Sequence, residues 1–396
     1  MGHPALVILA AALISSSLGS LHAFSVFLEP LERAFGATRG DVSLLYSSAT
    51  ACLTVALLGG HLLYRRLQPA ALMLMVGLVA AIGLLIAGVG SSLLVVGFGY
   101  SVLFGSANGV GYGYALHIAQ RAAPDRKGLA IGVVTAAYAL GVVVFASAFA
   151  KLIAHGGAGF TFVAMAAIMF AVGLAGAALL RLAGAVDRDL PPDAAARSDP
   201  PRHQRTIALL WIGYCLGAAA GLMALGHAAG IVAATGGTYD QLVLGAIVIG
   251  LGNGVGGFAA GWLADRWPVR ILLVVAAVFS ASVLALIAIT TGPGAVIGGL
   301  ALVGFAYGAI IALYPVAVAT YFRPGETARI FGRVFTAWGL AGLGAPWLAG
   351  VLFDIWGGYE AALILAAVAA LLGAGVTTLL PAPRSRSELK ELWEQA

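Results

Sequence analysis

The sequence predicts an all-α membrane protein, with twelve transmembrane helices arranged as two pseudo-symmetric six-helix bundles. Three observations lead to this fold class. Of the 396 residues, 61% are hydrophobic and only 9% are charged. Apolar stretches long enough to cross a bilayer recur along the chain, and features of its first half return in its second half at an offset close to 200 residues.

The composition is that of a chain that faces lipid. A soluble domain carries about 25% charged residues, whereas this chain has a mean hydropathy of +1.00. Its 55 glycines suit membrane helices, in which small residues bring backbones close together. The net charge of +5 arises from basic residues in short loops, so it indicates membrane orientation and gives no reason to expect a nucleic acid partner.

Twelve apolar segments can each form a transmembrane helix, which needs about 20 residues. They must be helices, because every backbone polar group has to be satisfied without water. The first segment has no basic stretch before it and no small-residue cleavage site, so we expect a span and not a signal peptide. The twelve segments lie near residues 5–28, 41–63, 69–91, 93–120, 128–152, 158–181, 206–234, 241–264, 269–291, 294–321, 328–353 and 358–380.

A polar segment rich in proline and charge separates the two sets of six spans. We therefore expect an N-terminal bundle over residues 1–182, a linker over 183–205, a C-terminal bundle over 206–382 and a tail over 383–396. All but three of the 21 Lys and Arg residues lie in even-numbered connections, the linker or the tail, the exceptions being Arg33, Arg39 and Lys151. The positive-inside rule then makes both termini and the linker cytoplasmic, in a multi-pass protein of a bacterial inner membrane.

The two halves match at several positions in the same order. The segment GHLLYR from Gly60 corresponds to GWLADR from Gly261, and each follows the second span of its half. Further along, Tyr114 and Tyr138 correspond to Tyr314 and Trp338. Duplicated six-helix halves related by an axis along the membrane normal are a transporter architecture.

The segment GWLADRWPVR, residues 261–270, resembles the signature loop of the major facilitator superfamily. That resemblance implies a cytoplasmic gate formed by Gly261, Asp265, Arg266 and Arg270. Asp265 is expected against the positive N-terminal end of the eleventh helix, and both arginines are expected to pair with nearby carboxylates or carbonyls. The first-half copy carries Tyr64 in place of the acid, which implies a weaker latch there.

Three other stretches resemble the monocarboxylate transporters and the oxalate/formate antiporters within that superfamily. They are LGSLHAFSVFLEPLE from Leu18, PDRKGLAIG from Pro124 and FTAWGLAGLGAP from Phe335. The resemblance implies transport of a small organic anion. The chain departs from the family where basic residues are expected. In span eight, Asn253 occupies the position of the family's polar residue and Gly257 that of its arginine. In span eleven, Trp338 occupies the position of the lysine found in oxalate transporters. No Lys, Arg, Asp or Glu falls near the middle of any predicted span.

Histidines are therefore the titratable groups expected at depth in the membrane. His22 lies in the first span, where monocarboxylate transporters carry a lysine, while His227 lies in span seven and His117 near the cytoplasmic end of span four. An imidazole gains and loses its proton in the physiological pH range. A protonated His22 could hold a monocarboxylate and carry the coupled proton in the same step. The alternative for each histidine is a structural hydrogen bond, which is the expectation for His117.

A central cavity between the halves is expected to be lined by polar and aromatic side chains. Tyr112 and Tyr307 could contribute to it, and interhelical packing is the alternative for every member. Proton coupling is assigned to His22, Glu29 and Asp41, although solvated carboxylates at the interface would explain the two acids equally well. The predicted substrate-binding residues are His22, Asn108, Tyr114, Tyr138, His227, Asn253, Tyr314 and Trp338.

The predicted function is secondary active transport of a monocarboxylate-like anion by alternating access, with proton coupling or exchange. An exporter of neutral or amphipathic compounds is the alternative, and a membrane sensor without net transport is a minor one. The chain has no HExxH, Gly-x-Ser-x-Gly or nucleotide-binding motif, so we expect neither an enzyme nor a cofactor or metal. The expected partners are the small-molecule substrate, protons and the lipid bilayer, and the expected state is a monomer.

Overall fold

The computed structural model describes residues 3–64, 66–185, 201–322 and 324–381. Every regular element in these ranges is helical, which confirms the predicted all-α class. The predicted linker is described only at its two ends, because its residues 186–200 lie outside these ranges, as does the predicted tail, 383–396.

The first half contains irregular as well as regular helices. The first span is built from α1 (Pro4–Leu18), a 3₁₀ segment η1 (Gly19–Phe27) and α2 (Leu28–Phe35), and the fourth span from α6 (Leu93–Gly97), a π-helical segment η2 (Phe98–Phe104) and α7 (Gly105–Ala122). The other elements of this half are α3 (Arg39–Gly59), α4 (His61–Tyr64), α5 (Pro69–Val89), η3 (Pro124–Arg126) and α8 (Lys127–Leu182).

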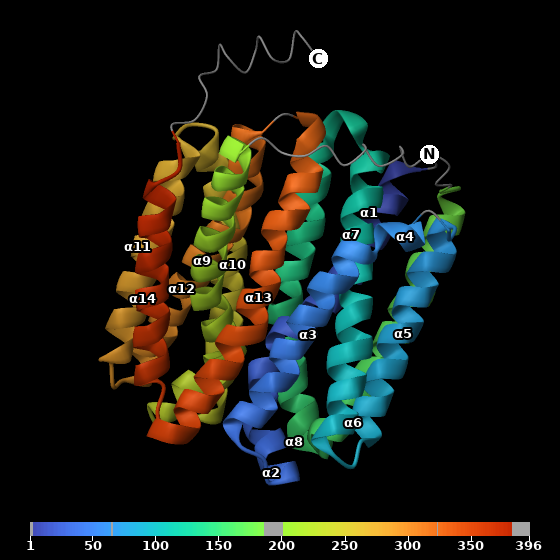
Figure 1. Ribbon diagram of the computed structural model, residues 1–396. Coiled ribbons are helices and arrows are strands. Elements are labelled where there is room, and N and C mark those ends of the chain that lie inside the picture. Colours follow the sequence, from blue (N-terminus) through green and yellow to red (C-terminus); the bar gives the residue numbers. More distant parts are fainter. Residues whose placement is uncertain (1–2, 65, 186–200, 323, 382–396) are drawn as a thin grey trace.

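The second half is made of six long helices. They are α9 (Pro201–Ala234), α10 (Tyr239–Ala264), α11 (Val269–Ala288), α12 (Pro293–Tyr321), α13 (Pro324–Trp356) and α14 (Glu360–Thr378). The two halves stand side by side, with their helices running between the face that carries the described chain ends and the opposite face (Figure 1).

Helix α8 contains the fifth and sixth predicted spans. Its 56 residues are far more than one crossing needs, and the chain turns back at Gly157, which has φ of 78°. Glycine adopts such left-handed backbone geometry without steric cost. Ten further helices or helix runs are long and apolar enough to cross a membrane. The twelve predicted spans are therefore all present.

The first span is longer than the predicted segment 5–28. The helix continues to Phe35 as the amphipathic α2, in which the exposed Arg33 pairs with Glu29 one turn earlier. The charged residues suggested a helix end, but charges are tolerated here because α2 extends beyond the apolar part of the bundle.

Glycines bring the second and fourth helices of each half into backbone contact. A Cβ atom on Gly109 would lie 2.0 Å from the carbonyl oxygen of Leu53, and one on Gly308 would lie 1.9 Å from that of Asn253. The next glycines, Gly105 and Gly304, face Ala49 and Ile249 in the same way. The repeat therefore preserves a tight helix crossing in each half.

The most extensive contacts between the halves are those of α3 with α13 and of α8 with α10. Along the contact between α3 and α13, Gly350, Gly342 and Gly339 face Ser43, Thr50 and Thr54 in turn. On the other side of the molecule, the hydroxyl of Tyr239 in α10 donates to the carbonyl of Ala150 in α8 at 2.8 Å.

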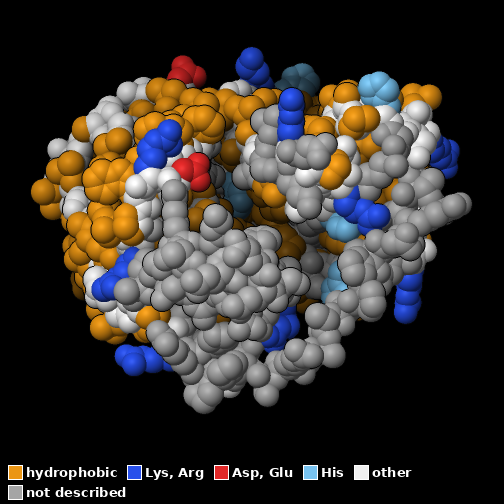
Figure 2. All heavy atoms as spheres, turned by 90° about the horizontal axis from the view of Figure 1, so that it is seen from above, with side chains coloured by type: hydrophobic (Ala, Val, Ile, Leu, Met, Phe, Trp, Pro, Cys, Tyr) orange, Lys and Arg blue, Asp and Glu red, His pale blue; other side chains and the backbone are white. Residues whose placement is uncertain are grey.

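The face that carries the chain ends is hollowed near its middle, between the two halves, and bears many Lys and Arg side chains (Figure 2). We call the opposite face the outer face.

Candidate functional site

The 3₁₀ segment η1, in the middle of the first span, packs against α8. A Cβ atom on Gly19 would lie 2.0 Å from the backbone oxygen of Tyr138, so only glycine permits this approach. A 3₁₀ helix has three residues per turn, so His22 lies one turn beyond Gly19 on the same face. Local geometry thus directs the imidazole of His22 toward Tyr138.

His22 is buried between the two halves, with 6% of its surface exposed. Its Nδ1 is 2.7 Å from the hydroxyl of Tyr46 on α3. Its ring is edge-on to Tyr138 of α8 and Trp338 of α13, at centroid distances of 5.7 and 6.5 Å. Tyr138 and Trp338 correspond by the internal repeat, so the repeat places one aromatic ring from each half beside His22.

Hydrogen bonds fix the side chains around this centre. Tyr138 donates to Oδ1 of Asn108 at 3.1 Å, and Nδ2 of Asn108 donates to the carbonyl of Leu18 at 2.7 Å. In the second half, Nε1 of Trp338 donates to the hydroxyl of Tyr307 at 2.8 Å. The ring of Tyr112 lies 4.6 Å from that of Tyr138. We call this set the central cluster: His22, Tyr46, Asn108, Tyr112, Tyr138, Tyr307 and Trp338.

The chemistry of the central cluster is aromatic, with hydroxyl, amide and indole groups and one imidazole. None of its members is a carboxylate, an ammonium or a guanidinium group. Within the described residues, Nδ1 is the one ring nitrogen of His22 that has a hydrogen-bond partner. Nε2 is therefore available to a ligand, as an N–H donor in the neutral tautomer that Tyr46 supports or in the protonated ring.

Tyr46 was not among the predicted residues. The sequence does contain a signal for it, because Ser43, Tyr46, Ser47, Thr50 and Thr54 form a polar stripe at helical spacing in an otherwise apolar span. Such a stripe indicates a helix face directed at the bundle interior, which is where α3 carries Tyr46.

Two predicted substrate-binding tyrosines lie inside their own halves. Tyr114 packs on Tyr64 at a centroid distance of 5.0 Å, and Tyr314 stacks on Tyr214 at 4.2 Å. Tyr114 follows Asn108 by six residues, which places it on a different face of α7, whereas Tyr112 follows by four and shares the face of Asn108. Asn253 lies at the crossing of α10 and α12, where its backbone meets Gly308.

The structure does not bring His227 to the central cluster. This fully buried residue of α9 lies toward the outer face, where its Nδ1 is 2.9 Å from the hydroxyl of Tyr359 and its Nε2 is 2.7 Å from the carbonyl of Pro346. Both ring nitrogens are used within the protein, so neither remains for a substrate.

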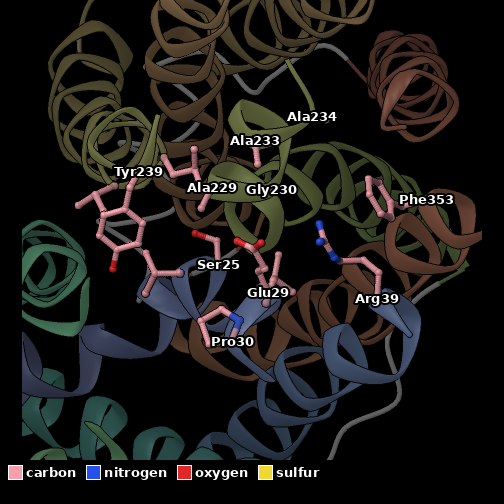
Figure 3. Close-up of a pocket in the computed structure, with 14 residues that line it drawn as sticks. Ser25, Glu29, Pro30, Arg39, Ala229, Gly230, Ala233, Ala234, Tyr239 and Phe353 are labelled. Atoms are coloured by element: carbon pink, nitrogen blue, oxygen red, sulfur yellow. The ribbon is translucent and has the colours of Figure 1, made fainter. Parts of the chain in front are cut away.

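The two predicted proton-coupling acids have local partners. The carboxylate of Asp41 accepts from the backbone N–H and the hydroxyl of Thr38, at 3.2 and 2.8 Å, and so completes a capping box with Thr38 at the start of α3. Glu29 pairs with Arg33 and lines an outer pocket of about 230 Å³, which also contains Ser25, Arg39 and Phe353 (Figure 3). Neither acid contacts His22.

The residues of the predicted cytoplasmic gate lie at the end of α10, in the following loop and at the start of α11, on the face that carries the chain ends. Arg266 donates to the carbonyl of Trp262 at 2.8 Å, and Arg270 donates to the carbonyl of Thr378, so both arginines bind carbonyls as expected. Gly261 and Asp265 are exposed, and no hydrogen bond or ion pair joins Asp265 to the described part of α13. In the first-half copy, burial raises the pKa of Tyr64, which stays neutral and donates to the carbonyl of Val110 at 3.1 Å.

Known proteins resemble this chain in sequence and in fold. The profile of the Major Facilitator Superfamily matches residues 210–396. Monocarboxylate transporter 13 of Bos taurus is 28% identical over 380 residues, which cover 92% of this chain and 85% of that protein. The uncharacterized MFS-type transporter YhjX of Escherichia coli strain K12 is 22% identical over 338 residues, covering 83% of each chain.

Solved structures share the fold over almost the whole chain. A bacterial homolog of the human lysosomal transporter Spinster, in an inward-facing and occupied conformation, matches with a TM-score of 0.75 at 16% identity and covers 96% of this chain and 97% of its own. Its inward-facing and unoccupied form matches with a TM-score of 0.71 at 14% identity and covers 95% and 96%. Taken with the twelve spans and the internal repeat, these matches show that the chain has the fold of the major facilitator superfamily and is similar to membrane transporters of that superfamily.

Proposed function

We propose that this transporter moves a small monocarboxylate-like anion together with a proton, and that the central cluster is its binding site. One observation supports this most directly: His22 is buried between the halves, held at Nδ1 by Tyr46, with Nε2 available to a ligand. The similarity to a monocarboxylate transporter over 92% of the chain supports the same substrate class.

The coupling follows from the cost of burying charge. A lone carboxylate or a lone imidazolium is costly to bring into a poorly solvated site, but the two together form a neutral, hydrogen-bonded pair. The central cluster holds no other fixed charge that could balance either one. The site therefore favours binding the carboxylate and the proton together, or neither, over binding one of them alone. Transport is consequently electroneutral.

The two halves share the site, as alternating access requires. Tyr138 and Asn108 belong to the first half, whereas Trp338 and Tyr307 belong to the second. Rocking of one half against the other changes the distance between these pairs while His22 keeps the bound anion. Access to the site then alternates between the two faces.

The orientation that we propose has both termini in the cytoplasm of a bacterial cell. Arg66, Arg121, Arg266 and Arg270 lie on the face of the chain ends, whereas Arg33, Arg39 and Lys151 lie toward the outer face. This asymmetry agrees with the positive-inside rule. The protein would act as a monomer in the inner membrane.

Export of a neutral or amphipathic compound is the second candidate. Its support is the aromatic lining of the central cluster, which has no permanently charged side chain to favour an anion. In that case His22 serves as a hydrogen-bond donor and carries no proton.

Uptake into proteoliposomes tests the proposal. We expect saturable uptake of labelled small carboxylates that an inward proton gradient stimulates and that a potassium–valinomycin potential leaves unchanged. His22→Gln should lower gradient-driven uptake at least about tenfold, the effect of losing a hydrogen bond to a charged group. His155→Gln is the matched control, because His155 is exposed and lies far along α8 from the central cluster.

Two outcomes would contradict the proposal. If well-folded wild-type protein takes up no carboxylate but exports amphipathic dyes, the second candidate replaces the first. If His22→Gln keeps full stimulation by the proton gradient, the coupled proton binds elsewhere.

A further inference from the structure

The outer face is closed by a buried network that joins the two halves, and the central cluster takes no part in it. Arg39, the first residue of α3, is only 9% exposed. Its Nε and Nη2 bind the carboxylate of Glu32 in its own half, while its Nη1 donates to the hydroxyl of Tyr359 in the other half at 2.7 Å. The guanidinium group also lies 4.3 Å from the ring centroid of Phe353 (Figure 3).

The direction of the hydrogen bonds in this network is determined by Arg39, which can only donate. Because Tyr359 accepts from Arg39, its phenol proton points to Nδ1 of His227. The proton of His227 then resides on Nε2, which donates to the carbonyl of Pro346 in α13. Burial raises the pKa of Tyr359 to about 12, so the phenol keeps its proton at physiological pH.

A second contact at the same place involves the N-terminus of α3. The first amides of a helix have no partner within the helix, and the helix dipole favours negative charge beside them. In α3, the N–H of Asp41 is satisfied by Thr38 of the same half. The N–H groups of Arg39 and Gly40 donate instead to the carboxylate of Asp354 in the other half, at 2.8 and 2.7 Å. One half of the protein therefore caps a helix of the other.

Glycines make the close approach possible. A Cβ atom on Gly230 of α9 would lie 2.4 Å from the hydroxyl of Tyr359 and 2.8 Å from Nη1 of Arg39. A Cβ atom on Gly350 of α13 would lie 2.8 Å from the carbonyl oxygen of Arg39. The glycines thus allow the helices of the two halves to approach closely enough to close the outer face.

We propose that Asp354 and Arg39 form an outer latch, which holds the outer face closed and must release α3 before that face can open. Release is feasible because Asp354 is at the surface, so water replaces its bonds to the two amides as the halves separate. On the opposite face the molecule is hollowed, and within the described residues Asp265 makes no hydrogen bond or ion pair with α13. Among the described residues, the carboxylate of Asp354 therefore joins the two halves on the closed side.

The test measures opening of the outer face directly and needs no substrate, so its result is independent of the proposed substrate and coupling. A cysteine-free background, Cys52→Ala with Cys215→Ala, receives the reporter Ser47→Cys. Ser47 is fully buried, its hydroxyl has no partner in the described structure, and its helical spacing places it on the α3 face that packs on α13. Intact cells that carry this variant are then treated with a membrane-impermeant maleimide, and the labelling rate of Ser47→Cys is measured. A parallel sample with His155→Cys confirms that the reagent reaches the outer face.

Asp354→Asn should label about tenfold faster than the background, a change in the opening equilibrium that corresponds to about 1.4 kcal/mol. Asn keeps the size of the side chain but replaces a charged acceptor that serves two amides. Asp41→Asn is the matched control, since it removes a carboxylate from the same helix end without touching the other half. Its labelling rate should equal that of the background.

An unchanged rate in Asp354→Asn would overturn the proposal. So would an equal increase in Asp41→Asn, because the carboxylate of Asp354 would then only stabilise α3. If Asp354→Asn does not fold, as judged by size-exclusion chromatography, Gly230→Ala gives the same test by separating Tyr359 from Arg39. Its matched control is Gly298→Ala, at an exposed glycine of α12 with no atom within 4 Å of the added Cβ.

Discussion

At the scale of single residues, the two deeply buried histidines differ in how their ring nitrogens are used. Both nitrogens of His227 bind groups of the protein, whereas only one nitrogen of His22 has a partner among the described residues. Burial alone therefore does not distinguish a structural histidine from one that can bind a ligand. The number of occupied ring nitrogens does.

The hydroxyl of Tyr46 orients the ring of His22, and substitution of Tyr46 can separate this role from the binding role of His22 itself. It can donate to Nδ1 of the neutral ring and accept from Nδ1 of the protonated ring, so it orients His22 in both states. Tyr46→Phe should therefore raise KM for the transported anion up to about tenfold, since a hydrogen bond contributes about 0.5–1.5 kcal/mol. The midpoint of the pH dependence should stay the same. Uptake at several substrate concentrations and pH values measures both quantities.

The control for this variant is Tyr214→Phe. Tyr214 is fully buried inside the second half, and its hydroxyl has no hydrogen-bond partner in the described part of the chain. Its removal should leave KM unchanged. A KM for Tyr46→Phe equal to that of wild type, or a displaced pH midpoint, would show that the hydroxyl does not act as an orienting group.

At the scale of helices, irregular segments and glycine contacts position the site. The 3₁₀ turn of η1 carries His22, and Gly19 brings that turn against α8. The contact of Gly308 with the backbone of Asn253 sets the distance between α10 and α12, and α12 carries Tyr307. Tight helix packing is thus a condition for the geometry of the central cluster.

Gly308→Ala should destabilise the fold. The added methyl group would have to displace backbone atoms of α10, and overpacking of this kind costs about 1–3 kcal/mol. Gly298→Ala, on the same helix, should have no such effect because its Cβ meets no atom within 4 Å. Thermal unfolding of both variants in detergent measures the difference. Equal unfolding temperatures would mean that the crossing of α10 and α12 relaxes without cost.

At the scale of the whole molecule, the two faces differ in both charge and closure. The halves meet at the outer face through Asp354, Arg39 and Tyr359, whereas the face of the chain ends is hollowed between them (Figure 2). The proposed orientation would make this hollow the cytoplasmic opening.

Labelling in intact cells tests the orientation. In the cysteine-free background, His155→Cys lies exposed near the turn at Gly157, and Gln68→Cys lies exposed at the start of α5, on the face of the chain ends. An impermeant maleimide should modify the first variant in intact cells and the second only after the cells are opened, because the positive-inside rule keeps the arginine-rich face in the cytoplasm. The reverse pattern would invert the topology.

By itself, the sequence determined the properties that depend on one segment at a time. The number of spans, the duplication, the charge asymmetry and the presence of His22 in an apolar helix follow from local composition, because lipid permits only helices with satisfied backbones. The two arginines of the signature loop also bind carbonyls, as their local setting suggested.

Tertiary structure decided which side chains meet. Tyr114 and Tyr314 pack inside their own halves, whereas Tyr138 and Trp338 meet His22, although both pairs are repeated. Contacts between segments far apart in the chain placed Tyr46 beside His22, occupied both nitrogens of His227 and set Asp354 on the N-terminus of α3. Such contacts depend on how the halves close against each other, and hydrophobic periodicity carries no information about that packing.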